Sequence, residues 1–183
     1  MKNLLIIGTP RSGKTSLANI FCDKFGFSLV SIDVIVSAFA KTFPELELHF
    51  EPEKSEKKLA PYIFAYMKAI LEEFPNRNFV VEGCHISPKN AFGNVDASKY
   101  KIVCLGFPDI TPERFLARVK QSKDKNDWLR TKSDVEILQI GADFIKKAKK
   151  QRQECEELGI EFLNTSENYE EKLQSFVNKF ASV

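Results

Sequence analysis

The residues best suited to chemistry lie near the start of the chain, in the stretch Gly8-Thr9-Pro10-Arg11-Ser12-Gly13-Lys14-Thr15. This stretch fits the phosphate-binding pattern G-x-x-x-x-G-K-[ST] at every fixed position. Glycines let the backbone approach an anion closely, and the loop N–H groups and the next helix N-terminus then point at it. Lys14 is expected to reach the β- and γ-phosphates of a nucleotide, and the Thr15 hydroxyl to bind Mg²⁺. We therefore predict a nucleotide-phosphate site in this loop and the adjoining Ser16.

The residues on either side of this loop, called the phosphate loop below, fit the same interpretation. Residues 4–7 form a short apolar run that is typical of a buried parallel strand. Residues 16–24 follow with apolar side chains at helical spacing. A strand that leads through a glycine loop into a helix is the context in which the pattern indicates phosphate binding.

The rest of the chain alternates between strand and helix patterns. Apolar runs predict four further strands, over residues 27–32, 78–83, 100–107 and 160–163. Helical spacing and capping residues predict the intervening helices, over 34–41, 59–74, from 111 onward, over 133–157 and from 168 onward. Residues 44–58 are predicted as a polar connection and 86–98 as a loop. This alternation predicts an α/β fold whose parallel sheet is covered by helices on both faces.

Composition and charge exclude several classes of protein. The chain has 183 residues, of which 43% are hydrophobic, and this is enough for one domain with a core, spanning residues 1–183. The net charge of +2 gives no strong attraction to nucleic acid or to membranes, and no segment resembles a signal peptide or a membrane span. The four cysteines lack the C-x-x-C spacing of a zinc site, which predicts reduced thiols in a cytoplasmic protein.

Several features together resemble the small P-loop kinases, the nucleoside-monophosphate-kinase-like enzymes that include shikimate kinase and chloramphenicol phosphotransferase. These features are the phosphate loop, Asp33 after the second predicted strand, Glu82-Gly83 after the third, and a basic segment between two late helices. The resemblance covers nearly the whole chain. It implies a three-layer P-loop NTPase fold with a five-stranded parallel sheet and a small lid near residues 120–133. It also implies Mg·ATP as the phosphoryl donor, an acceptor-binding region near 34–75, and adenine near the turn Asn164-Thr165-Ser166.

The resemblance suggests roles for acidic residues at the ends of strands. In shikimate-kinase-like members, an aspartate just past the second strand meets the acceptor hydroxyl. A carboxylate at Asp33 can orient such a hydroxyl and accept its proton, although Asp33 can also serve only as a helix cap. Glu82 can bind Mg²⁺ through water or contact the acceptor together with Gly83 and His85. Which carboxylate is the base stays open, as does a purely structural role for Glu82 or His85.

Positive charge must stabilise the transferring phosphoryl group, and three arginines are candidates. Arg114 and Arg118 lie four residues apart on one helix face, and Arg130 lies in the predicted lid. All three can instead be solvated surface residues. The lysine-rich run at 146–150 is interpreted as a solvated helix face.

These patterns predict transfer of the γ-phosphoryl group of Mg·ATP to a hydroxyl of a small molecule. No arginine lies between Thr15 and Asn76, so an acceptor phosphate has no obvious bidentate partner, although lysines such as Lys41 leave an anionic acceptor open. Alternatives are a nucleoside or nucleotide kinase, a kinase of nucleic-acid ends, and a non-enzymatic ATP-binding regulator. A GTPase is disfavoured, because its D-x-x-G and [NT]-K-x-D patterns occur here at 23–26 and 131–134, outside their required context.

Overall fold

Five parallel strands form one sheet in the order β2-β3-β1-β4-β5. The computed structural model describes residues 1–48, 52–122 and 127–181. The strands are β1 (Asn3–Gly8), β2 (Ser28–Ser31), β3 (Phe79–Glu82), β4 (Tyr100–Gly106) and β5 (Glu161–Asn164). In the centre of the sheet Ile6 of β1 pairs with Glu82 of β3 on one side and with Val103 of β4 on the other. The predicted five-stranded parallel α/β fold is confirmed.

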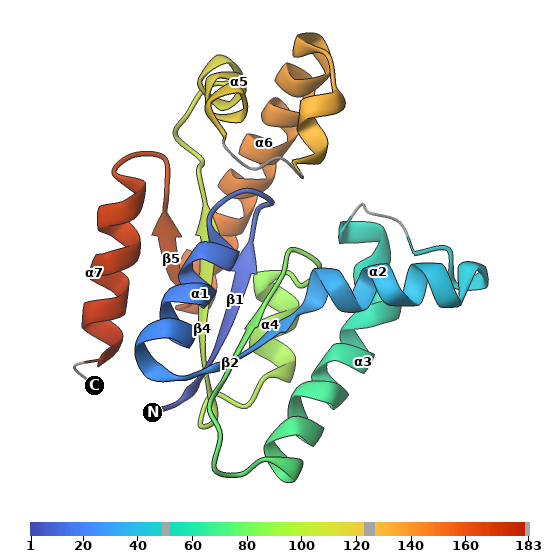
Figure 1. Ribbon diagram of the computed structural model, residues 1–183, viewed down its shortest axis with the longest axis vertical. Coiled ribbons are helices and arrows are strands. Elements are labelled where there is room, and N and C mark those ends of the chain that lie inside the picture. The colour runs from blue at the N-terminus through green and yellow to red at the C-terminus, as the bar shows by residue number, and fades with distance from the viewer. Residues whose placement is uncertain (49–51, 123–126, 182–183) are drawn as a thin grey trace.

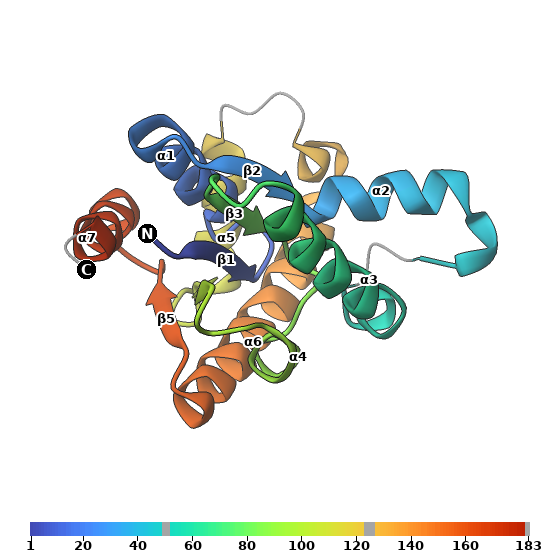
Figure 2. The ribbon, with the colours of Figure 1, turned by 90° about the horizontal axis from the view of Figure 1, so that it is seen from below.

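Helices cover both faces of this sheet. They are α1 (Lys14–Phe25), α2 (Ile32–Thr42), α3 (Pro52–Glu73), α4 (Pro88–Asn94), α5 (Pro112–Gln121), α6 (Asp134–Leu158) and α7 (Tyr169–Ala181), with two short 3₁₀ helices, η1 (Pro44–Leu46) and η2 (Trp128–Thr131). Figures 1 and 2 show α1 and α7 on one face and α3, α4 and α6 on the other, while α2 extends outward from the end of β2.

The alternation of side chains along β1 explains why two cores form. Leu4 and Ile6 point into the core shared with α1 and α7, whereas Leu5 and Ile7 point into the core shared with α3, α4 and α6. All four side chains are fully buried. A strand that is apolar on both faces is stable only between two layers of helices, so β1 occupies the middle of the sheet.

A third core lies apart from the sheet. It joins α5, the first half of α6 and η2 through buried side chains that include Phe115, Val119, Leu129 and Ile137. Figure 1 shows α5 and the start of α6 standing above the carboxyl ends of the strands. This unit, called the upper lobe below, carries η2 and therefore the described part of the predicted lid. Residues 123–126 of that lid, and 49–51 of the predicted acceptor region, are outside the described residues.

Several helix ends follow their sequence signals. The Thr111 hydroxyl accepts a hydrogen bond from the Arg114 N–H at the start of α5, and Ser133 and Glu136 form a capping box at the start of α6. Gly26 ends α1 in the left-handed conformation with φ 68°.

Three predicted boundaries are wrong. Helix α3 begins at Pro52, inside the predicted polar connection, because its first turn is polar and has no apolar periodicity to reveal it. Helix α4 occupies part of the predicted loop 86–98, where the Ser87 hydroxyl caps the Asn90 N–H and Pro88 starts the helix. Asp33 does not end a strand, since β2 stops at Ser31 and Asp33 lies in the first turn of α2.

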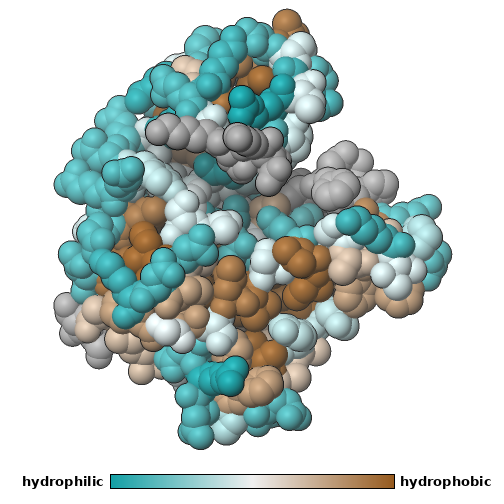
Figure 3. All heavy atoms as spheres, in the orientation of Figure 1, coloured by the Kyte–Doolittle hydropathy of each residue, from teal (hydrophilic) through white to brown (hydrophobic). Residues whose placement is uncertain are grey.

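The outer surface is mixed in character. Figure 3 shows apolar residues gathered near the junction of β2 and α2, where Leu29 and Val34 are exposed. Within the described ranges, none of the helices combines the length and apolar character needed to cross a bilayer.

Candidate active site

The phosphate loop connects the end of β1 to the start of α1 and has an unusual backbone. Gly8 and Gly13 have φ of 133° and 97°, and Arg11 has φ of 62°. A Cβ on Gly8 would lie 2.0 Å from the Leu105 backbone oxygen, and one on Gly13 would lie 2.3 Å from the Tyr169 ring. Both glycines are therefore required by conformation and by close approach.

Side chains of the loop turn inward. Lys14 is only 5% exposed, and its ammonium group donates to the Thr9 backbone oxygen at 2.9 Å. The Thr9 hydroxyl donates to Gln151 Oε1 of α6 at 3.0 Å. Among the described residues, the buried Ser12 hydroxyl has no hydrogen-bond partner. A loop curled around an ammonium group, with a buried hydroxyl left unpaired, fits an anionic ligand such as a nucleotide phosphate.

Thr15 and Glu82, which were predicted as metal ligands, lie side by side. The Thr15 hydroxyl donates to Glu82 Oε2 at 3.3 Å across the ends of α1 and β3. Glu82 is 3% exposed, and burial raises the pKa of its carboxyl group, while the Lys14 ammonium opposes that rise and Asp33 adds to it. A hydroxyl and a carboxylate oxygen at one point are ligands that Mg²⁺ prefers, so these two residues fit the ion.

Asp33 meets the residues that follow β3. Its Oδ1 atom accepts a hydrogen bond from the Cys84 N–H at 3.2 Å and lies 3.7 Å from His85 Nε2. Burial lowers the pKa of His85 and raises the pKa of the Cys84 thiol to about 11, so both groups are neutral near pH 7. The Asp33 side chain itself is 48% exposed, which leaves its carboxylate accessible to a ligand.

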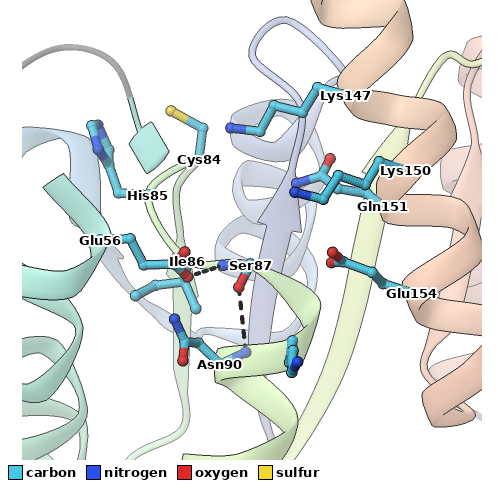
Figure 4. A pocket seen from close by; sticks show the side chains of 11 residues that line it. Glu56, Cys84, His85, Ile86, Ser87, Asn90, Lys147, Lys150, Gln151 and Glu154 are labelled. Atoms are coloured by element: carbon cyan, nitrogen blue, oxygen red, sulfur yellow. Dashed lines mark hydrogen bonds between the residues drawn. The ribbon is translucent and has the colours of Figure 1, made fainter. Parts of the chain in front are cut away.

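A cavity of about 330 Å³ adjoins these residues. Figure 4 shows Cys84 and His85 at one end, Glu56 of α3 on one wall, and Lys147, Lys150, Gln151 and Glu154 of α6 on the opposite wall. The Lys147 ammonium group points toward Cys84 in this view. The interpretation of 146–150 as a solvated face is wrong for Lys147, which is half-buried and lines the cavity, whereas Lys150 lines the cavity and is exposed.

The predicted arginines lie on the upper lobe. The Arg118 guanidinium donates to the backbone oxygens of Thr165, at 3.3 Å, and of Ser166, so it holds the turn after β5. Thr165 is buried there, and its N–H donates to the Gly106 oxygen at 2.8 Å. Arg114 pairs with Glu167 at 3.2 Å. Arg130 is exposed on η2, and the structure leaves its role as a phosphate ligand a prediction.

A contact between the phosphate loop and the lid was not predicted. Arg11 Nη1 lies 2.5 Å from Asp127 Oδ2, and the Asp127 side chain is only 1% exposed. Asp127 also caps η2 by accepting the Leu129 N–H at 3.1 Å. This ion pair joins the phosphate loop to the described part of the predicted lid.

The sequence gives only a partial signal for the cavity residues of α6 and none for Asp127. Lys147, Lys150, Gln151 and Glu154 recur at helical spacing, so they share one face of a helix, but nothing in the spacing shows that this face lines a cavity. Asp127 lies within a polar segment of the sequence and shows no pattern that would single it out.

Comparison with known proteins gives a result only at the level of structure. No protein-family model matches the chain, and no curated protein sequence matches it. A shikimate kinase from Bacteroides thetaiotaomicron superposes with a TM-score of 0.56 at 17% identity, covering 100% of this chain and 99% of that one. A deoxyadenosine kinase from M. mycoides with bound dATP gives 0.52 at 14% identity, covering 99% and 100%. A shikimate kinase from Aquifex aeolicus gives 0.51 at 16%, covering 98% and 96%.

Proposed function

The chain has the fold of the small P-loop kinases, and from that premise we propose that it transfers the γ-phosphoryl group of Mg·ATP to a hydroxyl of a small molecule. The observation that carries the proposal is the convergence of Lys14, the Thr15–Glu82 pair and Asp33 at the carboxyl end of the sheet. The Lys14 ammonium and the Asp33 carboxylate both lie close enough to the buried Glu82 to shift its pKa, Lys14 downward and Asp33 upward. Donor and acceptor groups would therefore meet where parallel α/β sheets bind ligands.

The donor side consists of the phosphate loop and the residues around it. The loop N–H groups and Lys14 would bind the phosphates, and Thr15 with Glu82 would hold Mg²⁺, which would neutralise charge on the phosphates. The turn at 164–166, held by Arg118, is where the resemblance places adenine. Arg130 would approach the phosphates from the lid and help exclude water, because water is a competing acceptor.

The acceptor side combines Asp33 with the cavity. Asp33 would orient the acceptor hydroxyl and take its proton as the oxygen attacks phosphorus. The cavity volume of about 330 Å³ is at the small end of ligand pockets, which favours a small metabolite over a nucleoside. Lys147 and Lys150 favour an acceptor molecule that carries an anionic group. The carboxylates of Glu56 and Glu154 can accept hydrogen bonds from hydroxyl groups of the same molecule. Nucleoside acceptors remain the alternative, because a deoxyadenosine kinase shares the fold.

The test is a phosphotransfer screen. The full chain with Mg·ATP is incubated with a pool of hydroxylated acids, sugars, nucleosides and short oligonucleotides, and products are identified by mass spectrometry. We expect one phosphorylated small molecule, which disappears in Lys14→Ala and persists in Lys24→Ala, a lysine of the same helix whose ammonium pairs with Gln174. Phosphorylated oligonucleotide would support a nucleic-acid kinase. Mg·ATP binding without any product would support a regulator.

A further inference from the structure

Three side chains of different ligand type converge beside the cavity: the Asp33 carboxylate, the Cys84 thiol and the His85 imidazole. One ligand atom from each lies within 4.8 Å of the other two. Asp33 Oδ1 is 3.5 Å from Cys84 Sγ and 3.7 Å from His85 Nε2. We propose that these residues bind a thiophilic divalent cation of the Zn²⁺ type, and that the bound ion blocks phosphotransfer.

The distances match what such an ion requires. With Zn–S bonds of about 2.3 Å and Zn–N or Zn–O bonds of about 2.0–2.2 Å, neighbouring ligands of a tetrahedral site lie about 3.3–3.7 Å apart. The separations of Asp33 Oδ1 from Cys84 Sγ and from His85 Nε2 therefore need little adjustment to become edges of that tetrahedron. An oxygen, nitrogen and sulfur set is typical of zinc, whereas Mg²⁺ prefers oxygen ligands and is expected at Thr15 and Glu82 instead.

The surroundings provide support and access. The Cys84 N–H donates to Asp33 Oδ1, which holds the carboxylate in place. Among the described residues, the buried His85 Nδ1 atom has no hydrogen-bond partner, so no hydrogen bond at Nδ1 opposes metal binding by the ring. Figure 4 shows the Cys84 sulfur and the His85 ring at the open cavity, through which an ion can enter. Two lysine charges, Lys14 and Lys147, oppose a cation here, and the carboxylates of Asp33 and Glu56 offset them.

Binding of the ion would release one proton from the protein. The Cys84 S–H bond breaks, a sulfur–metal bond forms and one proton is released, while neutral His85 and the Asp33 carboxylate each donate a lone pair. No oxidant or reductant takes part. The ion would then be bound to the Asp33 carboxylate, which is the proposed base for the hydroxyl proton. The ion and the acceptor molecule would therefore compete for Asp33. This last step rests on the proposed function, whereas the metal site does not.

The site is tested by titrating the metal-free full chain with Co²⁺ and following absorption from sulfur-to-cobalt charge transfer. We expect one Co²⁺ per chain, displacement by Zn²⁺, and no displacement by millimolar Mg²⁺. Cys84→Ser should abolish the band, and His85→Asn should weaken Co²⁺ binding at least tenfold. Cys22→Ser is the matched control and should keep the band, because Cys22 lies on α1 outside the cluster. Retained melting temperatures exclude loss of fold.

No charge-transfer band, or a band that survives Cys84→Ser, would overturn the proposal. A second arm compares phosphotransfer to the acceptor pool with and without one equivalent of Zn²⁺, and the expected loss is at least tenfold and reversed by a chelator. Undiminished transfer by the Zn²⁺-loaded protein would overturn the inhibitory role. Failure of the metal-free protein to phosphorylate anything would count against the proposed function alone, because the Co²⁺ band decides the site separately.

Discussion

At the scale of single residues, Asp33 has the contacts expected of a positioned base. The Cys84 N–H fixes one of its oxygens, and nearly half of its side chain is open to a ligand. Asp33→Asn keeps the shape but cannot accept a proton, so we expect turnover to fall about 10²–10⁴-fold with ATP affinity nearly unchanged. Steady-state kinetics and ATP titration measure the two effects. Asp23→Asn, an exposed acid on α1, is the control, and full turnover by Asp33→Asn would remove this residue from the mechanism.

Glu82 is a residue at which the proposed function and the stability of the fold conflict. Burial raises the pKa of its carboxyl group, so ionisation costs more in the folded than in the unfolded chain. Its contribution to stability is therefore greatest below the unfolded pKa and is lost as pH rises through the folded pKa. Glu82→Gln should melt at a higher temperature than the wild type near pH 7 while losing Mg²⁺-dependent transfer.

The pH dependence makes this prediction specific. Melting temperatures measured between about pH 4 and about pH 8 should converge toward acid pH, where Glu82 of the wild type is protonated. Glu156→Gln, an exposed acid on α6, should show no such trend. A Glu82→Gln protein that melts lower than the wild type at pH 7 would contradict the argument.

At the scale of elements, α6 presents two lysine faces of different character. Lys147 and the exposed Lys150 line the cavity, whereas Lys146 and Lys149 are exposed and are not among its lining residues. A charge-assisted hydrogen bond contributes about 1.5–3 kcal/mol, so replacing both cavity lysines by alanine should raise KM for an anionic acceptor at least tenfold. The Lys146→Ala/Lys149→Ala double variant removes the same charge and should leave KM unchanged. Equal effects of the two pairs would show that only net charge matters, and weakened ATP binding would place the lysines on the donor side.

At the scale of the whole molecule, the upper lobe has a core separate from those that flank the sheet. Gly141 of α6 lies against Phe115 of α5, and a Cβ there would meet the ring at 2.7 Å. Gly141→Ala should therefore cost about 1–3 kcal/mol by overpacking. Hydrogen exchange should accelerate in α5 and early α6 while the strands stay protected, because each core can open separately.

The control for Gly141→Ala is the same substitution at a helical glycine that has no close neighbour. Gly93 of α4 has open space at its Cβ position, so Gly93→Ala should stabilise the protein by about 0.5–1 kcal/mol. Denaturant unfolding of both variants measures the change in the free energy of unfolding, which should fall for Gly141→Ala and rise for Gly93→Ala. Stabilisation by Gly141→Ala would contradict the tight packing of the upper lobe.

The sequence by itself determined the alternation of strands and helices, the phosphate loop and Glu82 at the end of a strand. These follow from local chemistry: apolar runs, capping residues and a glycine–lysine spacing that few other structures require. It did not reveal α4 or the start of α3, because short or polar helices have no apolar period to display.

Only the tertiary structure decided which side chains meet. Asp33 and Cys84 are 51 residues apart, and they touch because β2 and β3 are neighbours in the sheet. The cavity lies where α6 passes beside α4, and Lys147 and Lys150 of a polar run lie along its wall. Arg11 and Asp127 pair because the upper lobe lies above the phosphate loop. Such contacts depend on how helices and strands pack in three dimensions, and spacing along the chain does not encode them.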